Sequence, residues 1–566
     1  MKLRELLQNV DIINVLQGCD YTPSLTLPPE GGGQGWGGLD IDISGVSYNS
    51  RKVKEGHLFV ALKGEKYDGH DFIKEAIKNG AVAVVYDSEI NFSLLTSHFP
   101  LLKVRDSRKA LACITNNFYG RPSERLTIIG ITGTNGKTTT TYLLKSILES
   151  WGKEIGLIGT IQYMIKDKSY SALYTTPEAL EFHGLLRDML LSGCTHIISE
   201  VSSHALAQSR VNGTVFKTVV FTNLTRDHLD FHKTMEDYFR AKERLFRELL
   251  DKDGTSVINL DDLYGKRLNS KLKTQNSKLK KILTYGLEIG ADIMARDINS
   301  SFEGLRFKIA FRGRNYNISS ALIGLPNVYN IMAAAGASIS IGVPWDIILE
   351  GIKNAGTVTG RFEKVNLNQN FLCIVDYAHT EDALERLILT ARELIKKSLV
   401  NPPTHPSPSR GEGEGGGENS ELPGLALRSG AGRTPNSLPR GITVFGCGGD
   451  RDCGKRPKMG SVATKLSDFV IITSDNPRSE DPNEIIREIE AGAVRRNYLI
   501  EPDRAEAIKR AIMLVGDGDI VLVAGKGHED YQEIKGVRYR FNDREILEKA
   551  IKQRIKGKNN EENRKS

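Results

Sequence analysis

The segment Gly133–Thr139 has the residue types that bind a nucleoside triphosphate. A β-branched run, Thr127–Ile131, precedes it, and apolar residues spaced for one helical face follow it. Glycines let backbone N–H groups close around phosphate oxygens, and the start of a helix adds a positive dipole. Lys137 would then reach the outer phosphates, and the Thr138 hydroxyl would bind Mg²⁺. Ile131 stands where the strict P-loop pattern has glycine, but a chance Gly-Lys-Thr would lack the flanking strand and helix.

Polar residues follow two further predicted strands of the same region. Glu200 comes after the run His196–Ser199, where the Mg²⁺ of a P-loop nucleotide needs an oxygen ligand, and a helix-capping glutamate is the alternative. His228 follows the next strand and could bind a second metal, hydrogen-bond a phosphate or be structural. Lys242 lies on a predicted amphipathic helix, and this pattern alone makes it a surface lysine.

Four apolar runs in the last third of the chain each stop at a polar or glycine-rich turn. These turns are Asp376–His379, Gly446–Arg451, Ser474–Arg478 and Gly525–Glu529. Ligands of an open α/β sheet bind outside the carboxyl ends of the strands, so all four turns are expected to face one crevice. Arg478 can take a carboxylate bidentately, and Asp475 and Asn476 can read an ammonium group. The alternative is that Arg478 pairs with Glu480 or Asp481 on the surface.

These motifs need an α/β framework of three domains to hold them. Strands alternating with helical stretches predict a mostly parallel sheet around the P-loop, with antiparallel strands from about 284 to 322. We expect a small N-terminal α/β domain at 1–122 and a central P-loop ATPase domain at 123–356. A C-terminal Rossmann-like domain is expected at 357–566.

Two segments rich in Pro, Gly and Ser do not fit this framework. Residues 22–40 and 399–441 are nearly free of aromatic residues, so we interpret both as disordered insertions in helix-to-strand connections, away from the crevice. The alternative for the second segment is a functional lid. In the N-terminal domain, the apolar spacing from Leu3 to Ile13 predicts a helix, and residues 42–49 predict a strand.

The composition is that of an ordinary globular protein. The 566 residues are 39% apolar and 26% charged, and a net charge of +7 suits polyanionic small substrates better than nucleic acid. The six cysteines are scattered, without a disulfide framework or a zinc-binding spacing. The N-terminus lacks a signal peptide, and no window is apolar enough to span a membrane, so we expect a cytoplasmic protein.

An ordered set of motifs resembles the Mur ligases. The motifs are Gly133–Thr139, Glu200–Leu206, Asn223–Asp230, Ala241-Lys242, Asn327–Asn330, Gly360–Glu363 and Asp376–His379. The resemblance covers nearly the whole chain apart from the two insertions. It implies a uridine-nucleotide domain, a central ATPase and a C-terminal domain that brings an amino acid. The family reaction is ADP-forming amide synthesis through an acyl phosphate, within the peptidoglycan precursor synthesis that supports cell shape and division.

The third-domain motifs are similar to the branch of this family that adds meso-diaminopimelate to UDP-N-acetylmuramoyl-L-alanyl-D-glutamate. The resemblance implies catalytic roles for Lys137, Lys242, Glu200 and His228. Lys242 would be carbamylated and would hold Mg²⁺ with Thr138, Glu200 and His228, which replaces the surface interpretation of Lys242. The implied ATP-binding residues are Gly133, Thr134, Asn135, Gly136, Lys137, Thr138, Thr139, Asn330, Arg361 and Asp376.

The same resemblance implies two further groups of binding residues. The UDP-muramoyl-dipeptide would contact Tyr48, Ser50, Thr175, Thr176, Ser202, Gln208 and Arg210. Diaminopimelate would contact Arg451, Asp475, Asn476, Pro477, Arg478, Gly525 and Glu529. Tyr174 departs from the family pattern, because related enzymes often have asparagine before the two threonines.

Four alternatives remain open at this point. A member of the same family could add L-lysine, and a folylpolyglutamate synthetase-like ligase would leave Ser50-Arg51 unexplained. A P-loop motor or kinase would not need the turn Asp475–Arg478. A non-catalytic descendant damaged by its insertions is the fourth. We expect a monomer that uses ATP and Mg²⁺.

Overall fold

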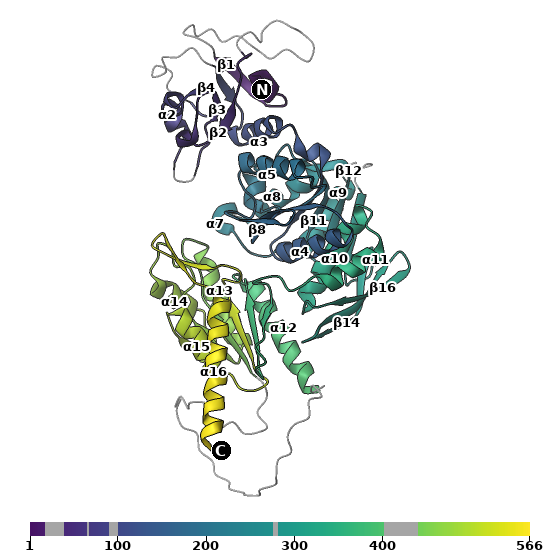
Figure 1. Ribbon diagram of the computed structural model, residues 1–566, viewed down its shortest axis with the longest axis vertical. Helices are drawn as coiled ribbons and strands as arrows, with labels where there is room; N and C mark the ends of the chain where they lie inside the picture. Colours follow the sequence, from purple (N-terminus) through teal and green to yellow (C-terminus); the bar gives the residue numbers. More distant parts are fainter. Residues whose placement is uncertain (17–38, 65–66, 90–99, 275–280, 401–439, 566) are drawn as a thin grey trace.

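The computed structural model describes residues 1–16, 39–64, 67–89, 100–274, 281–400 and 440–565. These residues form three lobes in chain order, each built on its own β-sheet, with the C-terminal helix α16 extending from the last lobe (Figure 1). Most neighbouring strands in the three sheets are parallel, so the predicted α/β class with mostly parallel sheets is confirmed. Among the described helices, none is long and apolar enough to cross a membrane.

The N-terminal lobe holds a five-stranded sheet with the order β1-β5-β4-β3-β2. Strand β1 runs antiparallel to β5, and the other pairs are parallel. The elements are α1 (Leu3–Leu6), β1 (Ile12–Leu16), β2 (Gly45–Ser47), β3 (His57–Val60), α2 (Ile73–Lys78), β4 (Ala81–Tyr86), β5 (Leu101–Val104) and α3 (Ser107–Phe118).

The prediction of a helix from Leu3 to Ile13 is wrong beyond its first turn. Helix α1 ends at Leu6, and Asn9 adopts a left-handed conformation with φ of 63°, which a right-handed helix cannot continue through. Ile13 instead belongs to β1, where 53% of its surface is exposed. The strand predicted at 42–49 is shorter than expected, because β2 comprises only Gly45–Ser47.

The central lobe holds an eleven-stranded sheet with the order β16-β15-β14-β13-β12-β11-β6-β10-β7-β8-β9. Its middle is parallel, and the predicted antiparallel strands β14–β16 form one margin. Its strands are β6 (Thr127–Thr132), β7 (Ile155–Ile158), β8 (Gln162–Ile165), β9 (Lys168–Ser171), β10 (His196–Glu200), β11 (Phe216–Phe221), β12 (Leu250–Asn259), β13 (Lys281–Gly286), β14 (Ile293–Ser301), β15 (Gly304–Phe311) and β16 (Arg314–Ser320). Its helices are α4 (Lys137–Ser150), α5 (Ala179–Leu191), α6 (Ser203–Ala207), α7 (Leu229–His232), α8 (Met235–Arg247), α9 (Leu263–Thr274), α10 (Leu325–Ser340) and α11 (Trp345–Asn354).

Both faces of the central sheet are covered, as its apolar strands require. Successive strand residues point to opposite faces, so Ile128 packs in a different core from Ile129 and Ile131. Ile129 and Ile131 share their core with α4, α10 and α11, whereas Ile128 shares its core with α5, α8 and α9. This two-sided packing fixes the direction of β6, and with it the place of the P-loop.

The C-terminal lobe holds a six-stranded sheet with the order β17-β18-β22-β19-β20-β21, in which only β17 pairs antiparallel. Helices α12–α14 cover one face, and α15 and α16 cover the other. Its strands are β17 (Glu363–Val365), β18 (Leu372–Asp376), β19 (Gly441–Phe445), β20 (Phe469–Ile472), β21 (Tyr498–Ile500) and β22 (Ile520–Ala524), with a separate hairpin of β23 (Tyr531–Ile534) and β24 (Val537–Arg540). Its helices are α12 (Glu381–Val400), α13 (Arg456–Leu466), α14 (Pro482–Glu490), α15 (Arg504–Leu514) and α16 (Asp543–Lys565).

The four ligand turns predicted in this lobe lie at one edge. Strands β18, β22, β19 and β20 are parallel neighbours, so the turns that follow them share the carboxyl edge of the sheet. The connection from α12 to β19, which contains the second predicted insertion, enters β19 at the opposite edge.

Most of both predicted insertions lies outside the described residues, but their ends need correction. Leu39 is 3% exposed and its carbonyl accepts a hydrogen bond from the Arg4 N–H, so it belongs to the N-terminal core. Helix α12 runs to Val400, and Gly441 already belongs to β19. The first insertion follows β1, so it does not interrupt a helix-to-strand connection as expected.

Candidate active site

The loop between β6 and α4 has the backbone of a phosphate-binding loop. Gly133 and Gly136 have φ values of 152° and 86°, which side chains disfavour. A Cβ on Gly133 would lie 1.8 Å from the Thr222 hydroxyl, and one on Gly136 would lie 2.4 Å from Asn330 Oδ1. Only glycine fits both positions. The loop therefore packs directly against the end of β11 and against α10.

Lys137 is the first residue of α4, and its ammonium turns back over the loop. Its Nζ donates to the carbonyl oxygens of Gly133 and Thr134 at 3.0 and 2.9 Å. Burial lowers the pKa of Lys137, and the nearby Glu200 carboxylate opposes this effect. An ammonium at the start of a helix, beside backbone N–H groups, is suited to an anionic ligand.

Glu200 ends β10 with its side chain fully buried beside the loop. Its Oε2 accepts hydrogen bonds from the hydroxyls of Thr138 and Thr160 at 3.1 and 2.9 Å, and its Oε1 accepts one from the Thr160 N–H at 3.0 Å. Glu200 is a strand residue, so the helix-capping alternative is wrong. Thr160 was not singled out from the sequence, because it lies in the loop between β7 and β8 without a motif around it.

Lys242 is buried, and the surface interpretation that its helical pattern favoured is wrong. It is 1% exposed, its Nζ donates to the Gly133 carbonyl at 2.8 Å, and this ammonium lies 4.6 Å from the centre of the Tyr238 ring. Burial and the neighbouring Lys137 lower the pKa of Lys242 well below its ordinary value, although Asp227 opposes them. Two lysines therefore bind the carbonyl of one P-loop glycine.

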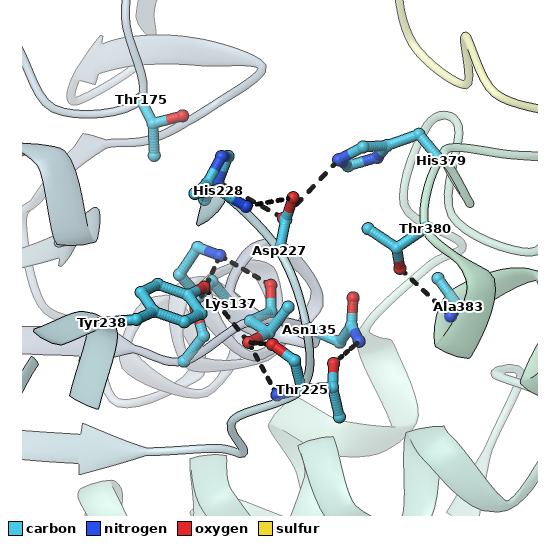
Figure 2. Close-up of polar contacts among 12 residues, drawn as sticks. Asn135, Lys137, Thr175, Thr225, Asp227, His228, Tyr238, His379, Thr380 and Ala383 are labelled. Carbon is cyan, nitrogen blue, oxygen red and sulfur yellow. Dashed lines mark hydrogen bonds and ion pairs between the residues drawn. The ribbon is translucent and has the colours of Figure 1, made fainter. Parts of the chain in front are cut away.

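Asp227 lies between two histidines that come from different lobes. Its Oδ2 is 3.3 Å from His228 Nε2 and 3.9 Å from His379 Nε2, and Figure 2 shows His379 reaching across from the C-terminal lobe. Burial lowers the pKa of His228 to about 3 and that of His379 to about 4. Both imidazoles are therefore neutral at physiological pH and can accept a hydrogen bond or bind a metal.

Further contacts bring the C-terminal lobe onto the P-loop. Asn135 Nδ2 donates to Asp382 Oδ2 of α12 at 2.9 Å, and Arg226 lies 3.3 Å from Asp452. Figure 2 places Asn135 and Lys137 on the loop that faces Thr380 of the C-terminal lobe. The carboxyl edges of the second and third sheets thus face each other and are in contact.

Three residues expected at the nucleotide gather beside the loop. Asn330 lies under Gly136, and its Nδ2 donates to Asn327 at 2.9 Å. The Arg361 guanidinium donates to the Thr138 hydroxyl at 3.1 Å, and its buried Nε has no partner among the described residues. Burial raises the pKa of Asp376, and its Oδ2 accepts from the Phe362 N–H at 2.6 Å.

A cavity of about 220 Å³ opens next to Asn327 and Arg361. Phe302, Leu322, Ile323 and Phe362 give it a mainly apolar wall. Phe362 lies in the motif Gly360–Glu363, but the sequence did not point to Phe302, Leu322 or Ile323, since apolar side chains carry no functional signal of their own.

Most residues expected at the nucleotide-peptide also gather near Glu200. The Thr175 hydroxyl lies 3.1 Å from that of Thr160, and Thr176 Oγ1 donates to the Glu200 carbonyl at 2.8 Å and accepts from the Ser202 N–H. Arg210 ties the group together through hydrogen bonds to the Thr176 carbonyl and to Gln208 Oε1, and through an ion pair with Glu178.

Tyr48 and Ser50 belong to the N-terminal lobe, apart from the expected nucleotide-peptide residues that gather near Glu200. The Tyr48 hydroxyl donates to Glu181 of α5 at 3.0 Å, so it bridges two lobes. The Ser50 hydroxyl donates to Glu75 at 2.7 Å, within its own lobe. No contact between Ser50 and the other expected ligands is seen in the described part of the chain.

The expected diaminopimelate residues lie on neighbouring turns of the C-terminal lobe. Asn476 Nδ2 donates to Glu529 Oε2 at 2.8 Å, and a Cβ on Gly525 would lie 2.5 Å from Asp475 Oδ2. Arg478 has φ of 52° and donates to the Gly449 carbonyl at 2.6 Å. The exposed Arg451 follows Gly449 on that same turn.

The alternative surface pairing of Arg478 is absent among the described residues. Glu480 pairs instead with Arg456 at 2.8 Å, and Arg456 is fully buried. Arg456 also donates to the Gly448 carbonyl at 3.2 Å, so it joins the turns after β19 and β20. Arg456 was not predicted from the sequence, and its only local signal is the run Lys455-Arg456, separated by three residues from Arg451, where the predicted turn ends.

Within the described residues, no group of three His, Cys, Asp or Glu side chains is arranged to hold a metal ion. Two oxygen groups that lie together at the P-loop are the Thr138 hydroxyl and the Glu200 carboxylate, 3.1 Å apart. Carboxylate and hydroxyl oxygens suit Mg²⁺, which usually keeps several waters and takes few protein ligands.

Comparison with known proteins shows the relationship of the whole chain. Residues 42–119, 131–338 and 426–527 match the profiles of the Mur ligase family catalytic domain, the Mur ligase middle domain and the Mur ligase glutamate ligase domain. The UDP-N-acetylmuramoyl-L-alanyl-D-glutamate–2,6-diaminopimelate ligase of Aquifex aeolicus is 42% identical over 510 residues, covering 90% of this chain and 94% of that protein.

Solved structures agree with this relationship. One of a UDP-N-acetylmuramoyl-L-alanyl-D-glutamate–2,6-diaminopimelate ligase is 32% identical with a TM-score of 0.60, and the match covers 91% of this chain and 95% of that one. The MurF ligase of Thermotoga maritima in complex with ADP shares the fold at 18% identity and a TM-score of 0.55, covering 92% of this chain and 99% of that one. The chain belongs to the Mur ligase family.

Proposed function

We propose that this protein is an ATP-dependent ligase that adds meso-diaminopimelate to UDP-N-acetylmuramoyl-L-alanyl-D-glutamate in peptidoglycan precursor synthesis. The observation that carries the proposal is the meeting of two carboxyl edges. The P-loop with Lys137 faces the turns of the C-terminal lobe, and Asn135 and Asp382 join them at 2.9 Å. Two such edges in contact could bring ATP, an acid and an amine together.

The chemistry of the two steps follows from the charges of the site. A carboxylate oxygen of the dipeptide attacks the γ-phosphorus of ATP, the bond to ADP breaks, and an acyl phosphate forms. The amine nitrogen of the amino acid then attacks the acyl carbon, phosphate leaves, and the amine loses a proton. Lys137 and Arg361 lie where they can offset the repulsion between a carboxylate and the γ-phosphate.

Mg²⁺ is part of this proposal, and when bound it would neutralise phosphate charge. Thr138 and Glu200 would hold it at the P-loop, because their oxygens already lie together. We place His228 near the metal, since its imidazole is neutral and lies beside Asp227.

Lys242 fits this role only after carbamylation. Its buried Nζ has a pKa well below the ordinary value, which raises the fraction of neutral amine that can add to CO₂ and lose a proton. The resulting anion would offset the positive charge of the neighbouring Lys137.

The nucleotide-peptide is proposed to lie between the first and second lobes. Thr175, Thr176 and Arg210 gather beside Glu200, close to the place where the acyl phosphate must form. Hydroxyls and a guanidinium suit pyrophosphate, sugar and peptide carboxylate groups. The domain division at 1–122, 123–356 and 357–566 stays a prediction, with the uridine nucleotide assigned to the first domain.

We assign the amino acid as meso-diaminopimelate and not lysine because of Arg478. The two amino acids differ by a distal carboxylate, which a guanidinium binds bidentately and which lysine lacks. The side-chain oxygen of Asn476, Oδ1, already accepts hydrogen bonds from the Lys526 ammonium and the Glu533 N–H. Asn476 can therefore offer a substrate only N–H donors. It suits a carboxylate better than the ammonium group expected from the sequence. Glu529 and Asp475 remain as the acceptors for the ammonium.

The test is a competition assay that scores which amino acid enters the tripeptide. The wild-type enzyme should reject lysine by several kcal/mol, because lysine leaves polar groups of the site unpaired. Arg478→Ala should lose most of this preference, and Arg487→Ala, an exposed arginine of α14, should keep it. Equal incorporation of lysine by the wild type would refute the assignment, and an unchanged preference in Arg478→Ala would remove Arg478 from it.

A P-loop motor or kinase would hydrolyse or transfer phosphate without the amino acid, so strict dependence of phosphate release on both co-substrates separates these classes. A folylpolyglutamate synthetase-like ligase would require a folate acceptor in the same assay.

We place the reaction in the cytoplasm, where ATP and UDP-linked precursors are available, and the monomeric state stays a prediction.

A further inference from the structure

Lys526 is a buried cation inside the turn that follows β22. Its side chain is 0% exposed, and its Nζ lies 3.0 Å from Asn476 Oδ1, 3.3 Å from Glu529 Oε2 and 3.8 Å from Asp475 Oδ1. A buried ammonium is costly unless it is paired and hydrogen-bonded, so these three contacts account for its presence. The family resemblance assigned no role to Lys526.

Lys526 determines which way the Asn476 side-chain amide faces. Asn476 Oδ1 accepts from Lys526 Nζ and from the Glu533 N–H at 2.9 Å, while its Nδ2 donates to Glu529. Exchanging the amide oxygen and nitrogen would place N–H groups against an ammonium and against another N–H. The amide therefore stays in its donor orientation toward Glu529 as long as Lys526 is charged.

Lys526 also sets the charge of the acidic pair Asp475 and Glu529. The other buried cation nearby, Arg504, is already matched by Asp543 through contacts of 2.7 and 2.8 Å, so that pair is neutral. Two carboxylates and one ammonium leave one negative charge. A single negative charge is what one incoming ammonium group can neutralise.

We propose that Lys526 is a positioning residue for the incoming diamino acid: it holds the Asn476 amide as a donor and places a counter-charge beside the Asp475 and Glu529 carboxylates, which receive the substrate ammonium. This inference rests on the proposed function and adds to it a residue that acts through others. Lys526 itself is buried beneath the acidic pair and need not touch the substrate.

The titration of the pair supports this assignment. Burial and the Asp475 carboxylate raise the pKa of Glu529, and Lys526 opposes both effects. Without Lys526, the pKa of Glu529 should rise further, toward neutral pH. The other titratable or charged groups around the pair are Arg504, Tyr377, Tyr531, Cys447, His528 and Glu533.

Four of these neighbours, Tyr377, Tyr531, Cys447 and His528, do not titrate near neutral pH. Burial raises the pKa of Tyr377 and Tyr531 above their ordinary values and that of Cys447 to about 12. Burial lowers the pKa of His528 to about 3. A new titration that appears near neutral pH when Lys526 is removed should therefore report Glu529.

The experiment compares wild type, Lys526→Met and the control Lys549→Met, an exposed lysine of α16. KM for meso-diaminopimelate is measured from pH 6 to 9 with ATP and the nucleotide-dipeptide saturating. Lys526→Met should raise this KM about 10–100-fold near pH 6.5, the range expected when a charged hydrogen-bond partner is lost. The ratio of variant to wild-type KM should fall as pH rises, while KM for ATP stays unchanged.

A second variant separates this role from a merely structural one. In Lys526→Met/Glu529→Gln the titrating carboxylate is gone, so the KM ratio should stay high but no longer depend on pH. The double variant can also replace Lys526→Met in the assay if Lys526→Met alone does not fold. It leaves Asp475 as the one buried carboxylate of the pair, so the cost of burying unpaired charge is smaller.

A Lys526→Met enzyme with wild-type KM, or with a KM ratio independent of pH, would overturn the proposal. A wild-type enzyme that forms no product with any diamino acid would instead contradict the proposed function, so the two failures are distinguishable.

Discussion

The guanidinium of Arg361 lies 3.1 Å from the hydroxyl of Thr138, although 223 positions separate the two residues in the chain. The same guanidinium lies 4.6 Å from the centre of the Tyr377 ring, which begins the turn after β18. Arg361 thus connects the P-loop to the first turn of the C-terminal lobe. Substituting Arg361 therefore tests whether contact between the two lobes is needed for the reaction.

Arg361→Ala should lower kcat/KM for ATP about 10²-fold, because one preorganised cation at a transferring phosphoryl group typically contributes that much. Arg361→Lys should recover only part of the loss, since an ammonium keeps the charge but loses the planar contact with Tyr377. Steady-state kinetics with Arg306→Ala as the control tests this, because Arg306 is 77% exposed. Wild-type kinetics in Arg361→Ala would exclude Arg361 from the nucleotide site.

Lys242→Ala should be nearly inactive, because the buried amine proposed to carry the carbamate is removed. Added short carboxylates should restore part of the turnover by occupying the vacated space. Phosphate release with and without acetate measures both effects. Full activity of Lys242→Ala without any additive would show that the carbamate is not needed.

Lys137→Ala should lower turnover by about 10²–10³ or more, since Lys137 would stabilise the charge of the transferring phosphoryl group. Its ammonium binds two P-loop carbonyls, so loss of stability must be checked separately by thermal unfolding. Near-normal turnover of a folded Lys137→Ala enzyme would remove the P-loop from the mechanism.

The N-terminal lobe should carry a pH-dependent contribution to stability at His70. Its Nδ1 lies 2.5 Å from Asp68 and its Nε2 lies 3.2 Å from Asp87. Burial disfavours the imidazolium, but these carboxylates outweigh burial and raise the pKa of His70 above 6.5. The stabilisation is therefore fully present below pH 6.5 and is lost as pH rises through the folded-state pKa.

His70→Gln should accordingly lower the denaturation midpoint more at pH 6 than at pH 9. His196→Gln is a contrasting variant, because burial lowers the pKa of His196 to about 4 and the unfolded chain therefore takes up this proton first. It should lower the midpoint more at pH 9 than at pH 6, the opposite of His70→Gln. Denaturant unfolding at the two pH values measures the difference. An equal effect of His70→Gln at both values would mean that the Asp68–His70–Asp87 contacts do not stabilise the imidazolium.

Deletion of residues 403–438 should leave kcat and all KM values unchanged. These residues fall between α12 and β19 in the chain, and β19 begins at the edge of the sheet opposite the ligand turns. Shortening a loop changes its closure entropy by only about 1 kcal/mol. Activity and thermal unfolding are measured together, and lost turnover in a protein that still folds would assign the segment to the site.

The parts of the site that are contiguous in the chain could be predicted from the sequence. The strand, the glycines and the helix around Lys137 are adjacent residues, so local propensity and the need for left-handed glycines define the P-loop. The four turns of the C-terminal lobe were also predictable, because parallel strands place their carboxyl ends at one edge of a sheet.

Features that depend on packing between distant elements could not be predicted in this way. The helical pattern around Lys242 is amphipathic, and it took the packing of α8 against the P-loop to bury that lysine. Likewise, the donor orientation of Asn476 and the role of Lys526 follow from the meeting of two turns and strand β23, which no spacing in the chain encodes. The cost of burying a charge depends on its partners in space, and those partners come from residues far apart in sequence.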